Sequence, residues 1–135
     1  LVLYNFNNKY IYMFNWKRKT AIYIGRFQPF HAGHKKLFEK ALKKNSQVAI
    51  LVMDSYKVNK KNPLKYSKVK RNITKSLKNY ENKFIVIKIP VVSEVVYGRK
   101  VGYKIRKIKL SKKIENISAT KIRKTKIFNS RKCVS

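Results

Sequence analysis

The sequence has very little of what several classes of protein depend on. Its single cysteine, Cys133, lies close to the end, which excludes an intrachain disulfide and a cysteine-rich metal site. Only five residues are acidic, so a metal site built on carboxylates would be short of ligands. No apolar run approaches the roughly 20 residues of a membrane-spanning helix, and the polar, Asn-rich start predicts no signal peptide. We therefore expect a cytoplasmic protein.

Basic residues, by contrast, are abundant. Lys and Arg together number 35, which gives a net charge of +30. A charge of this size is typical of proteins that bind polyanions. Most of these residues are Lys spread along the whole chain, whereas Arg, which suits bidentate contacts to bases, occurs only seven times. The composition favours small anionic substrates, and a nucleic acid partner stays open as an alternative.

The length of 135 residues and the hydrophobic fraction of 44% predict a single folded domain. Residues 1–19 show neither strand alternation nor a helical period, and we interpret them as an N-terminal extension. Met13 lies within this extension and is a candidate start of translation. Regular patterning begins at residue 20 and continues to about residue 130, which leaves a short tail over 131–135.

Apolar runs and helical periods alternate from residue 20 onward. Three apolar runs predict strands, namely 20–24 (TAIYI), 48–53 (VAILVM) and 84–89 (FIVIKI). Helical spacing predicts helices over 35–44 and 68–80, the second capped by Ser67, and a short last helix near Ser118. The segment 54–65 predicts a loop, 91–97 a short strand, and 103–110 a strand or an irregular stretch. Strands separated by helices indicate an α/β fold with a parallel sheet.

The segment 25–34, GRFQPFHAGH, follows the first predicted strand and opens the first predicted helix. A helix N-terminus offers unpaired N–H groups and partial positive charge, and phosphate favours both. Gly33 leaves room for an oxyanion near the backbone, while His31 and His34 are spaced to reach one pocket. These imidazoles can donate to an α-phosphate whose charge grows in the transition state. As a metal pair they would lack a third ligand, so we predict no metal held by protein side chains.

A second candidate segment, ISATKIR at 117–123, combines hydroxyl groups, a helix start and one guanidinium. Ser118, Thr120 and Arg123 predict a clamp for phosphate groups. Taken alone, the same residues also fit an ordinary capped helix.

Together the two segments resemble the signatures of the HxGH nucleotidyltransferase superfamily, the cytidylyltransferase-like group. GRFQP is most similar to archaeal-type nicotinamide-nucleotide adenylyltransferases, and ISATKIR is similar to the second signature, ISSTxxR. The resemblance spans residues 21 to about 128. It implies one small domain with a Rossmann-like, doubly wound parallel sheet. It also implies attack of an acceptor phosphate on the α-phosphorus, release of pyrophosphate with Mg²⁺ as cofactor, and no covalent intermediate.

The resemblance further implies roles for individual residues. His31 and His34 would bind the triphosphate and the developing charge, and Arg123 would neutralise the departing pyrophosphate. The remaining nucleotide and phosphate contacts would come from Gly25, Arg26, Phe27, Gly33, Ser118 and Thr120.

Signals for the acceptor and the base are weaker. The segment 62–64, which begins with Asn62, resembles an NPF-type loop near the acceptor, with a plain proline turn as the alternative. Arg71 on the following helix could meet an acceptor phosphate. Gly98 stands where relatives place nucleobase contacts, because a glycine lets a base lie close to the backbone. The stretch 90–117 is shorter than in typical nicotinamide-nucleotide enzymes, which leaves the base and the acceptor open.

We therefore expect an enzyme that transfers AMP from ATP to a small phosphorylated acceptor, with nicotinamide mononucleotide as the best match to GRFQPFH. A cytidylyltransferase acting on a small phosphate ester is one alternative. A nucleic-acid-binding protein on a degenerate transferase fold is another, motivated by the charge. The sequence predicts no oligomeric state.

Overall fold

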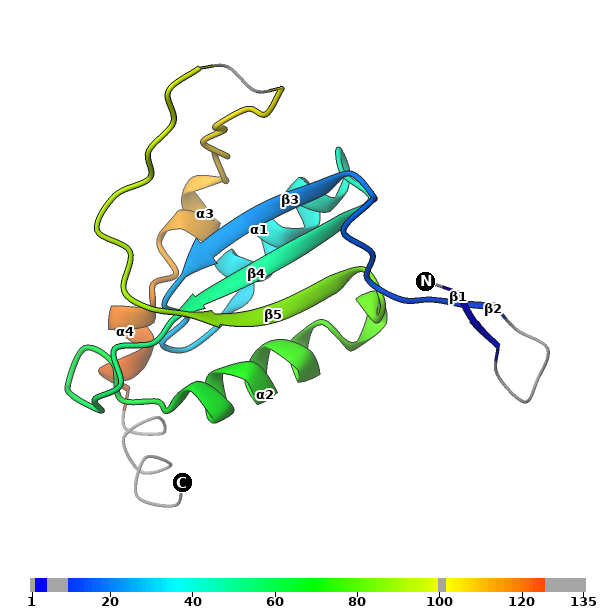
Figure 1. Ribbon diagram of the computed structural model, residues 1–135. Coiled ribbons are helices and arrows are strands. Elements are labelled where there is room, and N and C mark those ends of the chain that lie inside the picture. The colour runs from blue at the N-terminus through cyan, green and yellow to red at the C-terminus, as the bar shows by residue number, and fades with distance from the viewer. Residues whose placement is uncertain (1, 5–9, 100–101, 126–135) are drawn as a thin grey trace.

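The computed structural model describes residues 2–4, 10–99 and 102–125. Its centre is a parallel sheet with the strand order β3-β4-β5, formed by β3 (Thr20–Gly25), β4 (Gln47–Met53) and β5 (Phe84–Ile89). Helix α1 (Ala32–Leu42) connects the first two strands and helix α2 (Tyr66–Ser76) connects the second two (Figure 1). The predicted α/β, Rossmann-like parallel sheet is confirmed.

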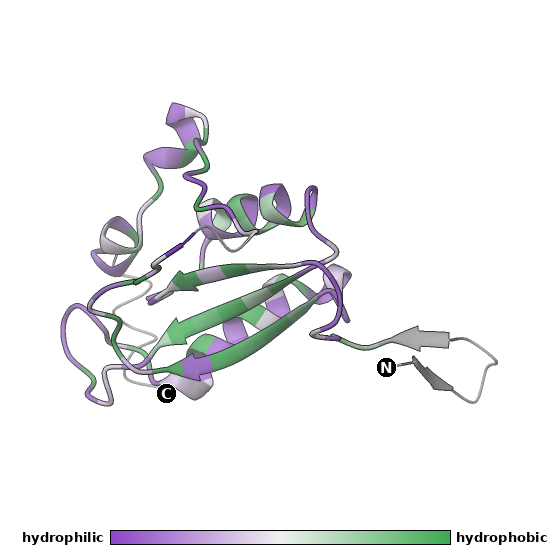
Figure 2. Ribbon diagram, turned by 45° about the horizontal axis from the view of Figure 1, so that its top comes forward, coloured by the Kyte–Doolittle hydropathy of each residue, from purple (hydrophilic) through white to green (hydrophobic). Residues whose placement is uncertain are grey.

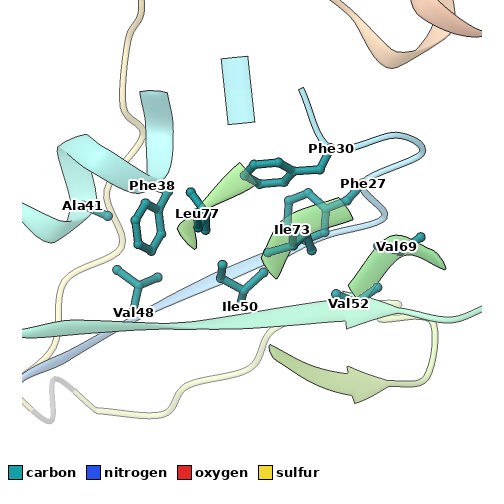
Figure 3. Packing of buried hydrophobic residues seen from close by; sticks show 10 residues of the cluster. All are labelled: Phe27, Phe30, Phe38, Ala41, Val48, Ile50, Val52, Val69, Ile73 and Leu77. Atoms are coloured by element: carbon teal, nitrogen blue, oxygen red, sulfur yellow. The ribbon is translucent and has the colours of Figure 1, made fainter. Parts of the chain in front are cut away.

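Both helices cover the same face of the sheet. Strand β4 is central, and its residues Val48, Ile50 and Val52 are at most 1% exposed. Figure 3 shows these side chains packed beneath Phe38 and Ala41 of α1 and beneath an apolar stripe formed by Val69 and Ile73 of α2 and its C-cap Leu77. Two helices on one face of consecutive parallel strands form one βαβαβ half of a doubly wound sheet.

The other face of the sheet carries no helix within the described residues. On edge strand β3, Ile22 is 53% exposed and Ile24 is 37% exposed. Figure 2 shows that the strands of the central sheet are largely hydrophobic along their length, whereas hydrophilic residues are frequent on the helices and loops. None of the described helices is long and apolar enough to cross a membrane.

Two short strands, β1 (Val2–Tyr4) and β2 (Tyr10–Tyr12), pair antiparallel in a separate sheet. The residues between them and the domain are tied to the amino end of β4 by Gln47, whose side chain is fully buried. Its amide group donates to the Asn15 carbonyl and to Thr20 Oγ1, and its oxygen accepts the Asn15 N–H at 3.1 Å. Asn15 is therefore attached to the sheet although it precedes the predicted domain boundary. The predicted tail at 131–135 lies outside the described residues.

Several predicted boundaries were wrong. Helix α2 begins at Tyr66, and its N-cap is Lys65 without a side-chain bond, so Ser67 lies inside the helix and does not cap it. The helix ends at Ser76, and the chain then tightens into a 3₁₀ turn over Lys78–Tyr80. A short helix α3 (Lys112–Glu115) was not predicted at all.

The strand predicted over 91–97 is also wrong, since this segment contains no strand. The segment 103–110, for which a strand or an irregular stretch was predicted, is irregular. Val95 and Val96 are 64% and 77% exposed. Strand propensity acts through packing of one face against neighbours, and here the valines come as adjacent pairs that would point to opposite faces. Valines stand on both faces of the segment, and Val91, Val95 and Val96 are all exposed, so no packed face fixes its register against the sheet.

Candidate active site

The segment 26–31 connects β3 to α1 at the carboxyl end of the sheet, where parallel α/β proteins bind their ligands. His31 is the N-cap of α1, and its Nδ1 accepts the N–H of Gly33 at 3.0 Å. His34 Nδ1 accepts the N–H of His31 at 3.2 Å. The two imidazoles thus form a reciprocal capping box, in which histidines replace the usual hydroxyl and carboxylate residues.

This cap fixes which ring nitrogens can face a ligand. Because each Nδ1 accepts a backbone N–H, the hydrogen-bond pattern assigns the proton of each neutral imidazole to Nε2. The rings of His31 and His34 stack with centroids 3.8 Å apart. The two Nε2–H groups therefore form a pair of neighbouring donors at the first turn of α1.

Both histidines are held in their neutral form. Burial lowers the pKa of His31. The pKa of His34 is lowered to about 3, chiefly by burial and further by the charge that His31 would carry. The ring of Phe30 stacks on His34 at 5.5 Å and that of Phe27 meets it edge-on at 5.0 Å, and these rings exclude water from His34. At neutral pH the pair donates hydrogen bonds without carrying a charge of its own.

Two glycines make room for this arrangement. A Cβ atom at Gly33 would lie 2.8 Å from His31 Cε1, so any side chain there would displace the imidazole. A Cβ atom at Gly25 would lie 2.7 Å from Cζ of Phe27. Phe27 has a positive φ of 52° and is 2% exposed, with its ring edge-on to Tyr23. Phe27 therefore supports His34 from the core and can contact a nucleotide only through its backbone.

The second signature is joined to this loop by Arg123. Helix α4 (Ala119–Arg123) begins at its N-cap Ser118, whose Oγ accepts the N–H of Lys121 at 3.1 Å. Arg123 Nη2 donates to Thr120 Oγ1 at 3.2 Å, and Nη1 donates to the Gln28 carbonyl at 2.6 Å. The two predicted signatures, 95 residues apart along the chain, are thus in direct contact. Figure 1 shows α4 beside the carboxyl ends of the strands.

Gln28 is a residue that the sequence reasoning missed. Its side chain is 6% exposed and makes two bonds to one residue: Nε2 donates to the Leu64 carbonyl at 3.0 Å, and Oε1 accepts the Leu64 N–H at 2.8 Å. The loop that contains Asn62, which is 9% exposed, is therefore fastened to the loop that carries the histidines. The available signal was a polar residue between two aromatic residues in a loop that must turn back over the core.

Three other predicted site residues, Arg71, Gly98 and Arg26, have exposed positions. Arg71 is exposed on the side of α2 opposite Val69 and Ile73. Gly98 is exposed, and a Cβ atom placed there would meet nothing within 4 Å. It belongs to the segment after β5, which runs away from the sheet (Figure 1). Arg26 follows β3 directly and is exposed. The ligand roles of these residues stay predictions.

Within the ranges that the structure describes, no three His, Cys, Asp or Glu side chains gather into a group that could hold a metal ion. A magnesium ion needs near-octahedral oxygen ligands and is usually held by one or two carboxylates together with substrate phosphates. The donor set of the described residues does not fit a resident Mg²⁺.

Comparison with known proteins shows the family to which the chain belongs. The family model described as cytidylyltransferase-like matches residues 22–91, and the chain belongs to this family. The match includes the loop with both histidines and ends before the second signature. Over 91 residues the chain is 34% identical to the phosphopantetheine adenylyltransferase of Wigglesworthia glossinidia brevipalpis. The aligned stretch covers 66% of this chain and 51% of the relative. The chain thus spans about half the length of this curated relative.

Among solved structures, the chain is similar to a bifunctional NMN adenylyltransferase/ADP ribose pyrophosphatase from Francisella tularensis, solved with and without AMP and a manganese ion. In both cases the TM-score is 0.51 at 27% sequence identity, and the match covers 55% of this chain and 23% of the other. The shared part supports the Rossmann-like nucleotidyltransferase fold.

Proposed function

We propose that this chain transfers a nucleotidyl group, AMP from ATP, to a small phosphorylated acceptor and releases pyrophosphate. The observation that carries the proposal is the pair of neutral imidazoles at the start of α1, whose Nδ1 atoms both accept backbone N–H groups, so that each Nε2 carries the ring proton. Fixed donors aimed at developing charge in a site with little water are usually the largest contribution to catalysis of this kind. Membership of the cytidylyltransferase-like family supports the same reaction class.

In the proposed reaction an oxygen of the acceptor phosphate attacks the α-phosphorus of ATP in line with the leaving group. A new P–O bond forms between acceptor and AMP, and the bond from the α-phosphorus to the bridging oxygen breaks, so pyrophosphate leaves with the electron pair. The Nε2–H groups of His31 and His34 stabilise the negative charge on the α-phosphate oxygens. No side chain of the protein forms a covalent intermediate.

Arg123 is proposed to stabilise the leaving group. Its guanidinium is fixed by Gln28 and Thr120 but retains further N–H donors, since it carries five in all. A guanidinium held rigidly in this way suits phosphate oxygens better than a flexible ammonium would. Mg²⁺ enters this scheme as part of the substrate, MgATP, because the described residues offer no carboxylate cage for it.

The acceptor is proposed to be nicotinamide mononucleotide, to which the GRFQPFH form points. The solved neighbour is an NMN adenylyltransferase and the curated relative a phosphopantetheine adenylyltransferase, so 4′-phosphopantetheine is the second acceptor to test. Both acceptors present a phosphate monoester as nucleophile, and the chemistry at His31 and His34 is the same for either.

The experiment measures pyrophosphate release by the purified chain with ATP or CTP, each paired with NMN or 4′-phosphopantetheine. Wild type is compared with His31→Ala and His34→Ala, and with Thr74→Ala on the exposed side of α2 as control. We expect release with ATP and one acceptor, a loss of at least about 100-fold in the histidine variants, and no change in the control. Release with CTP alone would support the cytidylyltransferase alternative. Absence of release with every pair would overturn the proposal.

The net charge of +30 keeps a nucleic-acid-binding function as a second candidate. It predicts binding of RNA or DNA whose affinity falls steeply with salt and persists at physiological ionic strength. Affinity that disappears near physiological salt excludes a dedicated nucleic acid surface.

A further inference from the structure

Gln28 joins three segments that are far apart in the sequence. Its backbone belongs to the loop with the histidines, its side chain bonds Leu64, 36 residues away, and its carbonyl accepts from Arg123, 95 residues away. We propose that Gln28 is a positioning residue that sets the acceptor side of the site relative to the nucleotide side. The inference rests on the proposed nucleotidyl transfer.

The bond pattern of the side chain resembles one rung of a β-ladder. A carboxamide offers one acceptor and one donor, and both are used on the N–H and C=O of the same residue, Leu64. Because Gln28 is only 6% exposed, water does not readily replace either bond. The position of Leu64 relative to the histidine loop is therefore fixed in two directions.

Leu64 passes this constraint to its neighbours. It directly follows Asn62 and Pro63, which are both buried, and it lies two residues before the first residue of α2. The turn that leads to it is closed by Asn59, whose Oδ1 accepts the Asn62 N–H at 2.8 Å. The end of the loop after β4 is thus ordered and attached to the histidine loop at Gln28.

The backbone carbonyl and the side chain of Gln28 contact different segments, Arg123 and Leu64 respectively. The carbonyl that Arg123 contacts belongs to the backbone and stays in place whatever side chain occupies position 28. The carboxamide alone holds Leu64. A side-chain substitution therefore releases the loop at 62–64 while Arg123, on the pyrophosphate side, keeps its partner.

Gln28→Met removes both side-chain bonds at nearly constant volume. Gln47→Met is the matched control, because Gln47 is the other buried glutamine and lies at the opposite, amino end of the sheet. Both variants lose buried amide bonds, so both lower the melting temperature. Only the first is expected to act on the site.

The first measurement is native-state hydrogen exchange of the Leu64 amide, which reports directly on the Gln28 bond and needs no substrate. We expect Gln28→Met to speed this exchange by about 10-fold or more relative to the Leu77 amide, which bonds Ile73 within the fold. Gln47→Met should leave this ratio as in wild type. Equal ratios in wild type and Gln28→Met would overturn the proposal.

The second measurement is a KM comparison with ATP and whichever of NMN or 4′-phosphopantetheine releases pyrophosphate. We expect Gln28→Met to raise the KM for the acceptor about 10-fold and the KM for ATP by less than about twofold. A parallel rise of both KM values, or the same acceptor shift in Gln47→Met, contradicts a positioning role. If no acceptor reacts, the proposed function fails, and the exchange measurement still decides whether Gln28 holds the loop.

Discussion

His31 and His34 cap one helix turn from opposite directions, with His34 Nδ1 accepting the His31 N–H while the two rings stack at 3.8 Å. Protonation of either ring at Nδ1 would break a cap bond and place a charge against the neighbouring ring. The pair is therefore stable only while both imidazoles are neutral.

This pair makes the stability of the fold depend on pH. The pKa of His34 is lowered from 6.5 to about 3, so the unfolded chain binds a proton that the folded chain rejects. The stability that neutral His34 contributes to the fold is complete above pH 6.5 and is lost as the pH falls from 6.5 toward 3. We expect the urea midpoint of wild type to fall over this window more steeply than that of His34→Asn, which has no imidazole. Parallel pH profiles of the two proteins would contradict the assignment.

Capping and catalysis are separable at position 34. In His34→Asn the side-chain oxygen replaces Nδ1 as acceptor for the His31 N–H, but no group replaces Nε2–H. We expect stability to stay within about 1 kcal/mol of wild type, whereas kcat falls by roughly 100-fold to 1,000-fold.

His34→Gln is the complementary change, because its amide reaches the Nε2 position and abandons the cap. It should cost about 1 kcal/mol of stability and retain more activity than His34→Asn. Urea unfolding and pyrophosphate release, measured on the same preparations, check both variants. Activity in His34→Asn equal to wild type would remove Nε2–H from the mechanism.

Gly33→Ala isolates the packing of His31. Alanine favours the helix by up to about 1 kcal/mol over glycine, but its Cβ would lie 2.8 Å from His31 Cε1. The imidazole must move, so we expect little loss of melting temperature and a fall in kcat of about 10-fold or more. Lys36→Ala, an exposed change on the same helix, should leave kcat unchanged. Wild-type kcat in Gly33→Ala would mean that the position of His31 is not critical.

Arg123→Lys keeps the positive charge and removes the fork that bonds Gln28 and Thr120. We expect pyrophosphate to inhibit this variant about 10-fold more weakly, because an ammonium on a flexible stem is not fixed toward phosphate. Lys124→Ala is the control, since its side chain is exposed and adjacent. Unchanged inhibition in Arg123→Lys would show that charge alone suffices.

The sequence predicted the central strands and the helix start at the two histidines because both depend on local patterns. The continuous apolar run of β4 and the Gly-containing turn before a helix constrain only nearby residues. The strand over 91–97 failed because strand formation needs a partner edge, and no local pattern reveals which edge is within reach.

Gln28 and Arg123 illustrate a second limit. A buried glutamine with both bonds satisfied and a surface glutamine in a loop look the same in a sequence, since the partner is the backbone of residue 64 and backbone carries no sequence signal. Arg123 was predicted as a phosphate ligand from its motif, but its bond to the Gln28 carbonyl depends on how the chain returns to the sheet. Contacts that span the whole domain require the folded structure.

The sheet face on which the described residues place no helix and the high positive charge have opposite effects on self-association. Ile22 and Ile24 are exposed on β3, an edge strand among the described strands, and such an edge can pair with the edge of another copy. At a net charge of +30, two copies repel each other strongly at low ionic strength. Salt shortens that repulsion to about 3 Å at 1 M, so light scattering should detect self-association that begins as salt is added and reverses on dilution. The repulsion between lysines would then keep copies of the protein apart in solution although one edge strand of the sheet has exposed isoleucines.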